Sequence, residues 1–269
     1  MTVSDPRCWP RPGSSLPLAD PAIPVVSIIA TANGDLACDD AAGRVVWRVG
    51  CVPEPWAWAP WQYATDGRFI GRWDDPDGVW RTLYVGDTRL ACYLEVLAAF
   101  RADPELAHQL HDIDEDPADI DAFPTTATGA LTTRWRDHRL IGSATLTGWY
   151  ILPADKQSLP TLRTRFLSLA VHHRLPDLDA AAIRLAEPRA LTQAIAGWAY
   201  HQTAPGGALI AGIHFDSRHG DRLDLRALFE RPGDGSISGH LAGVTSDPIQ
   251  VDDPDLNEAL RIHRLQWIT

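Results

Sequence analysis

Lysine and methionine are almost absent from this chain, which contains one lysine, Lys156, and one methionine, Met1. Basic charge is also scarce, because 24 Lys+Arg stand against 35 Asp+Glu and leave a formal net charge of −11. Nucleic-acid-binding proteins draw much of their affinity from basic surface, so an acidic chain would need one segregated basic face. The composition therefore argues against DNA or RNA as a direct partner.

Long apolar runs are missing as well. No stretch approaches the roughly 18 consecutive apolar residues that a membrane-spanning helix needs. The N-terminus also lacks the basic start and apolar core of a secretory signal. Four cysteines, Cys8, Cys38, Cys51 and Cys92, form no Cys-x-x-Cys pair. We therefore expect free thiols and a cytoplasmic protein with no membrane partner.

Common nucleotide and metal motifs are absent too. Neither Gly-x-Gly-x-x-Gly nor Gly-x-x-x-x-Gly-Lys occurs, and the ten histidines show no zinc-ligand spacing. The run Asp112-x-Asp114-x-Asp116 begins like a calcium loop, but Pro117 stands where glycine is needed. Phe123 also replaces the glutamate that would complete such a loop. A solvated acidic loop is the better interpretation, and we expect no metal cofactor.

What the chain does contain is typical of a globular protein, with 45% hydrophobic and 22% charged residues. Prolines crowd residues 1–24, which we expect to be irregular. Strands and helices do not alternate in βαβ order, which favours a single α+β domain. We divide the chain into an N-terminal extension (1–43) and a domain (44–269). The expected strands are 25–30, 44–49, 80–85, 140–152, 209–215 and 223–229, and the expected helices are 88–100, 159–169, 189–200 and 256–263.

Three polar residues in apolar surroundings are candidates for a functional site. Arg48 lies in the middle of a β-branched strand, so it either faces inward and needs an anion, or lies on a sheet edge and faces water. Glu95 has small, weakly polar residues one helical turn away. Such a carboxylate either pairs with an arginine or accepts a hydroxyl proton. Ser217 lies where a strand gives way to a turn, and its hydroxyl either faces a cleft or stabilises that turn.

Taken together and in this order, these segments resemble the RES domain family, which is named after a recurring Arg, Glu and Ser. The resemblance covers about residues 44 to 266 and leaves the first forty or so residues unexplained. Asp74 departs from the family pattern, in which asparagine is usual, and this puts one turn hydrogen bond in question. The matching segments are 46–49, 71–74 with Gly78, 83–85 with Glu95, 191–196, and 217–220 continuing through 227–230.

The resemblance implies a single α+β domain similar to the ADP-ribosyltransferase fold, with central β-sheets and flanking helices. It further implies an enzyme that consumes NAD by cleaving the nicotinamide–ribose bond, and no metal. Arg48, Glu95 and Ser217 would be the catalytic residues. Arg48, Arg72 and Tyr84 would bind the substrate, since the planar guanidinium suits the pyrophosphate and the tyrosine ring suits nicotinamide.

The acceptor of the ribose stays open between water, inorganic phosphate and a protein side chain. The first two would make the chain an NAD glycohydrolase or phosphorolase, and the third a protein mono-ADP-ribosyltransferase. The resemblance also implies that the chain is the toxin of a type II toxin–antitoxin pair and that a cognate antitoxin is its partner. It further allows the chain to form a homodimer. An alternative from another class is a module that binds a nucleotide or a partner without catalysis.

Overall fold

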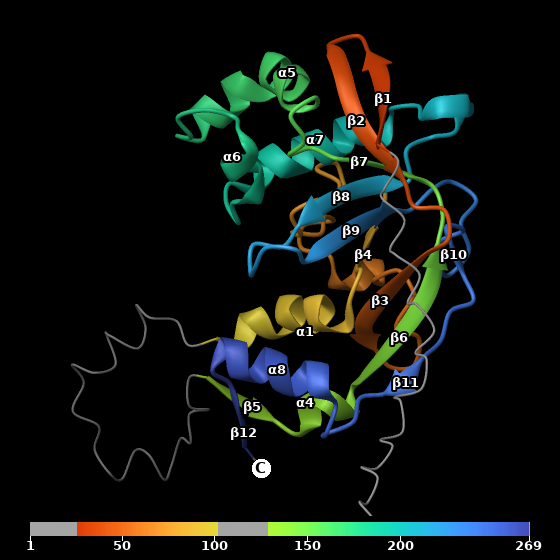
Figure 1. Ribbon diagram of the computed structural model, residues 1–269, viewed down its shortest axis with the longest axis vertical. Coiled ribbons are helices and arrows are strands. Elements are labelled where there is room, and N and C mark those ends of the chain that lie inside the picture. The colour runs from red at the N-terminus through yellow and green to blue at the C-terminus, as the bar shows by residue number, and fades with distance from the viewer. Residues whose placement is uncertain (1–25, 102–128, 269) are drawn as a thin grey trace, which may run out of the picture.

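The computed structural model describes residues 26–101 and 129–268, which form a mixed α+β arrangement around one large sheet (Figure 1). The strands are ordered β1-β2-β7-β8-β9-β4-β3-β6-β10, and β11 also pairs with β6. Two further strands, β5 and β12, form a separate parallel pair. The strands are β1 (Val26–Thr31), β2 (Gly34–Asp40), β3 (Arg44–Cys51), β4 (Thr82–Gly86), β5 (Ala130–Thr132), β6 (Arg139–Leu146), β7 (Trp149–Ile151), β8 (Gly212–Asp216), β9 (Asp224–Phe229), β10 (Leu241–Ala242), β11 (Asp247–Pro248) and β12 (Gln266–Ile268).

The helices form two groups on either side of the strands β8, β9 and β4 (Figure 1). Helices α5 and α7 pack on each other beside β2 and β8, whereas α1 and α8 pack together beside β3. None of the helices in the described ranges is long and apolar enough to cross a membrane. The helices are α1 (Arg89–Leu97), α4 (Arg134–Asp137), α5 (Leu159–His172), α6 (Ala180–Arg184), α7 (Arg189–Tyr200) and α8 (Pro254–His263).

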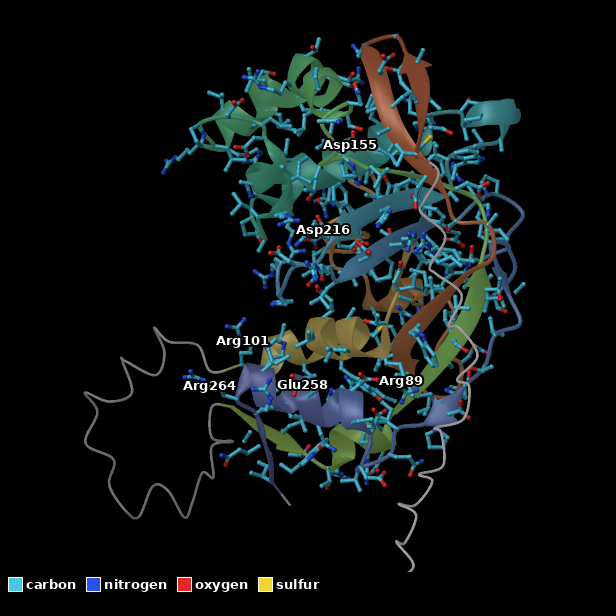
Figure 2. The ribbon with its side chains drawn as sticks, in the orientation of Figure 1. Arg89, Arg101, Asp155, Asp216, Glu258 and Arg264 are labelled. Carbon is cyan, nitrogen blue, oxygen red and sulfur yellow. The ribbon has the colours of Figure 1, made fainter. Side chains whose placement is uncertain are left out.

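Local capping explains where α1 and α8 begin. The side chain of Thr88 accepts a hydrogen bond from the amide of Ala91, as the expected helix start at this position requires. Asp253 caps α8 in the same way and also pairs with Arg89 at the start of α1 (Figure 2). The first turns of α1 and α8 therefore lie side by side, because Asp253 caps α8 and also pairs with the first residue of α1.

Most of the expected elements are confirmed, and α7 has the expected bounds. The single strand expected over 140–152 is wrong, because β6 and β7 are separated by a turn. Gly148 has a φ of +97° in that turn, and a Cβ there would lie 2.8 Å from Ala211 Cβ. The chain thus changes direction at a glycine inside an otherwise strand-like sequence. Strand β2 was not expected, although Leu36 and Cys38 on it are fully buried.

Strands β1 and β2 lie within the stretch that the sequence analysis assigns to the N-terminal extension. Strand β2 pairs with β7 over Cys38↔Ile151 and is therefore continuous with the large sheet. The described part of that stretch also contributes Ile29 to the core beneath α5. The remainder of the extension lies outside the described residues.

A buried ionic network crosses the middle of the sheet. Arg226 on β9 is fully buried and pairs with Asp39 on β2, at 3.1 Å, and with Asp87 after β4. His214 on β8 lies 3.2 Å from the same oxygen of Asp39, and Arg44 on β3 pairs with Asp87 at 2.9 Å. Arg44 and Arg226 thus share Asp87. His214 lies between Asp39 and Asp224, at 3.2 and 3.4 Å, so each cation of the network faces a carboxylate of the protein.

The sheet opens between β3 and β4. These neighbours share only the residue pair Trp47↔Gly86, although β3 pairs with β6 along its whole length. Beyond that pair the two strands separate, and the space between them is not filled by another strand. This opening positions the candidate functional site.

Candidate functional site

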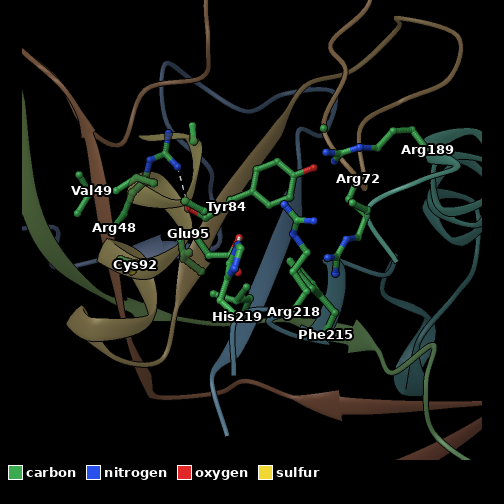
Figure 3. Close-up of a pocket in the computed structure, with 17 residues that line it drawn as sticks. Arg48, Val49, Arg72, Tyr84, Cys92, Glu95, Arg189, Phe215, Arg218 and His219 are labelled. Carbon is green, nitrogen blue, oxygen red and sulfur yellow. Dashed lines mark hydrogen bonds and ion pairs between the residues drawn. The ribbon is translucent and has the colours of Figure 1, made fainter. Parts of the chain in front are cut away.

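A cavity of about 370 Å³ begins at this opening and extends between α1 and the start of α7 (Figure 3). Its volume falls in the range of about 300–1,000 Å³ that small-molecule sites usually have. Four of the five residues singled out in the sequence line it: Arg48, Arg72, Tyr84 and Glu95. The fold thus brings together side chains from β3, from the turn before β4, from β4 itself and from α1.

Arg48 is anchored by the main chain. Its Nε donates to the carbonyl of Pro55 at 2.6 Å, and its Nη1 donates to the carbonyl of Tyr84 at 2.7 Å. Since β3 lies between β4 and β6, the alternative of an edge-strand arginine facing water is wrong. Burial lowers the pKa of Arg48 to about 10, so the guanidinium stays charged at neutral pH. Arg48 bridges the two strands where their own pairing stops.

The turn that carries Arg72 is closed by Asp74. One carboxylate oxygen of Asp74 accepts from the amide of Gly71 at 2.5 Å, and the other accepts from the hydroxyl of Tyr84 at 2.9 Å. A Cβ at Gly71 would lie 2.6 Å from that hydroxyl, so glycine is required for this approach. The aspartate that departs from the RES pattern therefore makes the turn hydrogen bond itself. Burial raises the pKa of Asp74 above its usual value.

Glu95 is held by a hydrogen bond from Ser217, in the loop after β8. The Ser217 hydroxyl donates to Glu95 Oε1 at 2.5 Å, which is the hydroxyl partner that the sequence allowed. Ser217 is itself buried and lies behind Glu95, not on the cavity wall. Its oxygen also accepts from the amide of His219 at 3.0 Å, so the loop after β8 fixes the serine rotamer. The carboxylate is therefore oriented before any ligand binds.

His219 is a cavity residue that the sequence reasoning did not assign. Its Nε2 lies 4.0 Å from Glu95 Oε2, and its ring packs edge-on against the ring of His263. Burial lowers the pKa of His219, an effect that Glu95 partly opposes and that Arg218 and His263 reinforce. A neutral imidazole therefore lies beside the carboxylate at neutral pH.

Arg189 and Arg218 also line the cavity and were not assigned. Arg218 belongs to the matched segment 217–220, so a signal was present, but nothing in the sequence separates it from the neighbouring loop residues. Arg189 begins α7 directly after Pro188, and no motif indicates that this helix start faces Glu95 from across the cavity. Both arginines reach the site only through the packing of distant segments.

Cys92 lines the cavity as well, but it is a poor nucleophile. Its thiol donates to the carbonyl of Trp47 at 3.0 Å, and burial raises its pKa to about 12. Within the described ranges, no group of three or more His, Cys, Asp or Glu side chains is arranged to hold a metal ion. The acidic stretch 112–116 lies outside the described residues.

Comparisons with known proteins give little further information. No protein-family model matches the chain, and no curated protein matches it by sequence. Among solved structures, it is similar to one described as the crystal structure of the M. tuberculosis MbcT-MbcA toxin-antitoxin complex, at 15% identity and a TM-score of 0.39. The match covers 82% of this chain and 89% of that one. At this distance we draw nothing about activity from it.

Proposed function

We propose that this protein cleaves the nicotinamide–ribose bond of NAD. One observation carries the proposal: Glu95, oriented by Ser217, is the only carboxylate among the described residues that line the cavity, and four arginines line the same cavity. NAD has the complementary charges, because its pyrophosphate is a dianion and its ribose becomes cationic as nicotinamide leaves. The resemblance of residues 44–266 to the RES family supports the same reaction.

The reaction assigns a role to each residue. The bond between ribose C1″ and the nicotinamide nitrogen breaks, and its electron pair leaves with nicotinamide. Glu95 stabilises the resulting positive charge on the ribose, while Ser217 is a positioning residue that holds the carboxylate. An acceptor oxygen then bonds to C1″ and loses its proton to the carboxylate or to water. The face of the Tyr84 ring packs on nicotinamide, since its hydroxyl is already bound to Asp74.

The variant Glu95→Gln tests this role, because it keeps the shape and removes the charge. We expect release of nicotinamide from NAD to fall by about 100-fold or more. The matched control is Glu258→Gln on α8, whose carboxylate pairs with Arg261 and with no other arginine in the described ranges (Figure 2). The control variant should keep full activity. Equal activity in Glu95→Gln and the natural chain would overturn the proposal.

The products identify the acceptor. Hydrolysis yields ADP-ribose, and phosphorolysis yields ADP-ribose-1″-phosphate at a rate that rises with phosphate concentration. A protein transferase would instead release nicotinamide only when its target protein is present. A module that only binds would retain NAD unchanged.

We also propose that the chain is a toxin with a cognate antitoxin as its partner, an inference that depends on the RES resemblance. Loss of NAD would stop growth, so expression of the natural chain should be toxic and expression of Glu95→Gln should be tolerated. Equal growth with both chains at equal protein levels would contradict the toxin role.

A further inference from the structure

We infer that Arg72, Arg189 and Arg218 together form the site for the diphosphate of a dinucleotide, and that Arg48 is not part of it. The inference names the anion subsite of the cavity and depends on the proposed function only for the identity of the nucleotide. Anion binding by the three guanidinium groups can be tested without knowing which nucleotide the protein uses.

The three arginines come from separate segments but meet at one end of the cavity. Arg72 lies in the turn before β4, Arg189 at the first position of α7, and Arg218 in the loop after β8. Figure 3 shows their guanidinium groups gathered near the Tyr84 hydroxyl and Phe215, on the other side of Tyr84 from Arg48. A diphosphate bound there would leave the ribose and nicotinamide to extend toward Glu95.

Most donors of these arginines remain available. Arg72 gives one weak hydrogen bond to the carbonyl of Arg184, at 3.3 Å, and its guanidinium lies over the Phe215 ring, 5.3 Å from the centroid. Arg189 uses only its Nε, which lies 3.2 Å from a carboxylate oxygen of Glu187. Arg218 makes no ion pair with any residue in the described ranges. Since each guanidinium has five N–H donors, the trio can make several bidentate contacts.

Positive charge gathers at this end of the cavity, although Glu187 pairs with Arg189 and Asp74 lies behind the Tyr84 hydroxyl. Burial lowers the pKa of Arg72, the nearby Glu95 only partly offsets this, and Arg189 and Arg218 lower it further. The three cations therefore repel one another in the empty protein, and a dianion between them would relieve that repulsion.

Arg48 differs from the three in its hydrogen bonds. Two of its nitrogens already donate to the carbonyls of Pro55 and Tyr84, and both partners belong to the main chain. The bond to Tyr84 joins β3 to β4, and the bond to Pro55 joins β3 to the segment that follows it. Arg48 is therefore a positioning residue that holds the cavity open.

The experiment measures binding of inorganic pyrophosphate and of ADP-ribose to the full chain by titration calorimetry at low ionic strength. We expect Arg189→Gln and Arg218→Gln each to weaken the binding of both ligands by about tenfold or more. The matched control is Arg222→Gln, which changes an exposed arginine of the same loop outside the cavity and should leave both affinities unchanged.

A second readout separates a binding role from a structural one. Because the trio is mutually repulsive, Arg218→Gln should leave the ligand-free melting temperature unchanged or raise it. Unaltered pyrophosphate affinity in both variants, or no pyrophosphate binding by the natural chain, would overturn the inference. If the variants lose binding but the natural chain does not cleave NAD, the anion site stands and the proposed function fails.

Discussion

The cavity and the buried network around Arg226 both place arginine among apolar strands, but they balance its charge differently. Arg226 is fully buried and contacts Asp39 and Asp87, and a histidine shares the first of these aspartates. In the cavity, Arg189 pairs with the exposed Glu187, whereas Arg72 and Arg218 make no ion pair with any residue in the described ranges. A balanced cluster needs nothing from outside, whereas an unbalanced one gains free energy when an anion binds.

This difference indicates what each region is for. A buried pair that loses one member leaves an uncompensated charge in a medium of low polarity, so the network should matter for folding. Arg189 and Arg218 are in contact with solvent, and both repel the buried Arg72, so these two arginines should matter for binding and little for folding. Variants in each region can test that division.

Arg226→Met should destabilise the protein most. The substitution keeps most of the side-chain volume but leaves Asp39, which is fully buried, without its guanidinium partner. We expect the free energy of unfolding in urea to fall by about 3–5 kcal/mol. Arg222→Gln is the control for loss of an arginine and should change the free energy of unfolding by no more than about 0.5 kcal/mol. If Arg226→Met were as stable as Arg222→Gln, the buried network would not matter more for folding than the exposed loop does.

Ser217→Ala should have the opposite profile. It removes the hydrogen bond that orients Glu95, at 2.5 Å, but creates no buried charge because Glu95 remains in contact with the cavity. We expect nicotinamide release to fall about tenfold, which corresponds to about 1.4 kcal/mol of barrier. The melting temperature should change little. A large loss of stability with full activity per folded molecule would show that this serine belongs to the framework.

The pH dependence of stability should reveal the network with the smallest of the three effects. Burial alone would raise the pKa of Asp39, but His214 and Arg226 lower it below its ordinary value of 3.8. Burial alone would lower the pKa of His214, but hydrogen bonds to Asp224 and Asp39 raise it above 6.5. The stability that Asp39 contributes to the folded state is thus lost as pH falls below 3.8. The stability that His214 contributes is lost as pH rises above 6.5.

Thermal unfolding across this range provides the measurement. The natural chain should lose stability as pH rises through the folded pKa of His214, and His214→Gln should lose less over the same interval. Parallel curves for the two proteins would show that His214 does not stabilise the folded state through its charge.

Local elements could be predicted from the sequence because their causes are local. Apolar periodicity and Pro188 define α7, and the hydroxyl of Thr88 starts α1. Strand β2 could not be predicted, since its short run of buried residues has no clear alternation and acquires its strand character by pairing with β1 and β7. The turn at Gly148 was missed for a related reason, because only Ala211, from another strand, shows why glycine is needed.

The site divides in the same way. The sequence by itself determined which unusual polar residues exist, and it singled out Arg48, Arg72, Tyr84, Glu95 and Ser217 as a group. Only the tertiary structure decided their partners. Arg48 donates to main-chain carbonyls, and the residue types in the sequence do not indicate such acceptors. Arg189 and Arg218 join Arg72 from segments that lie over a hundred residues away in the sequence. Electrostatic interactions depend on distance in space, so the balance of charge at each arginine appears only when the chain is folded.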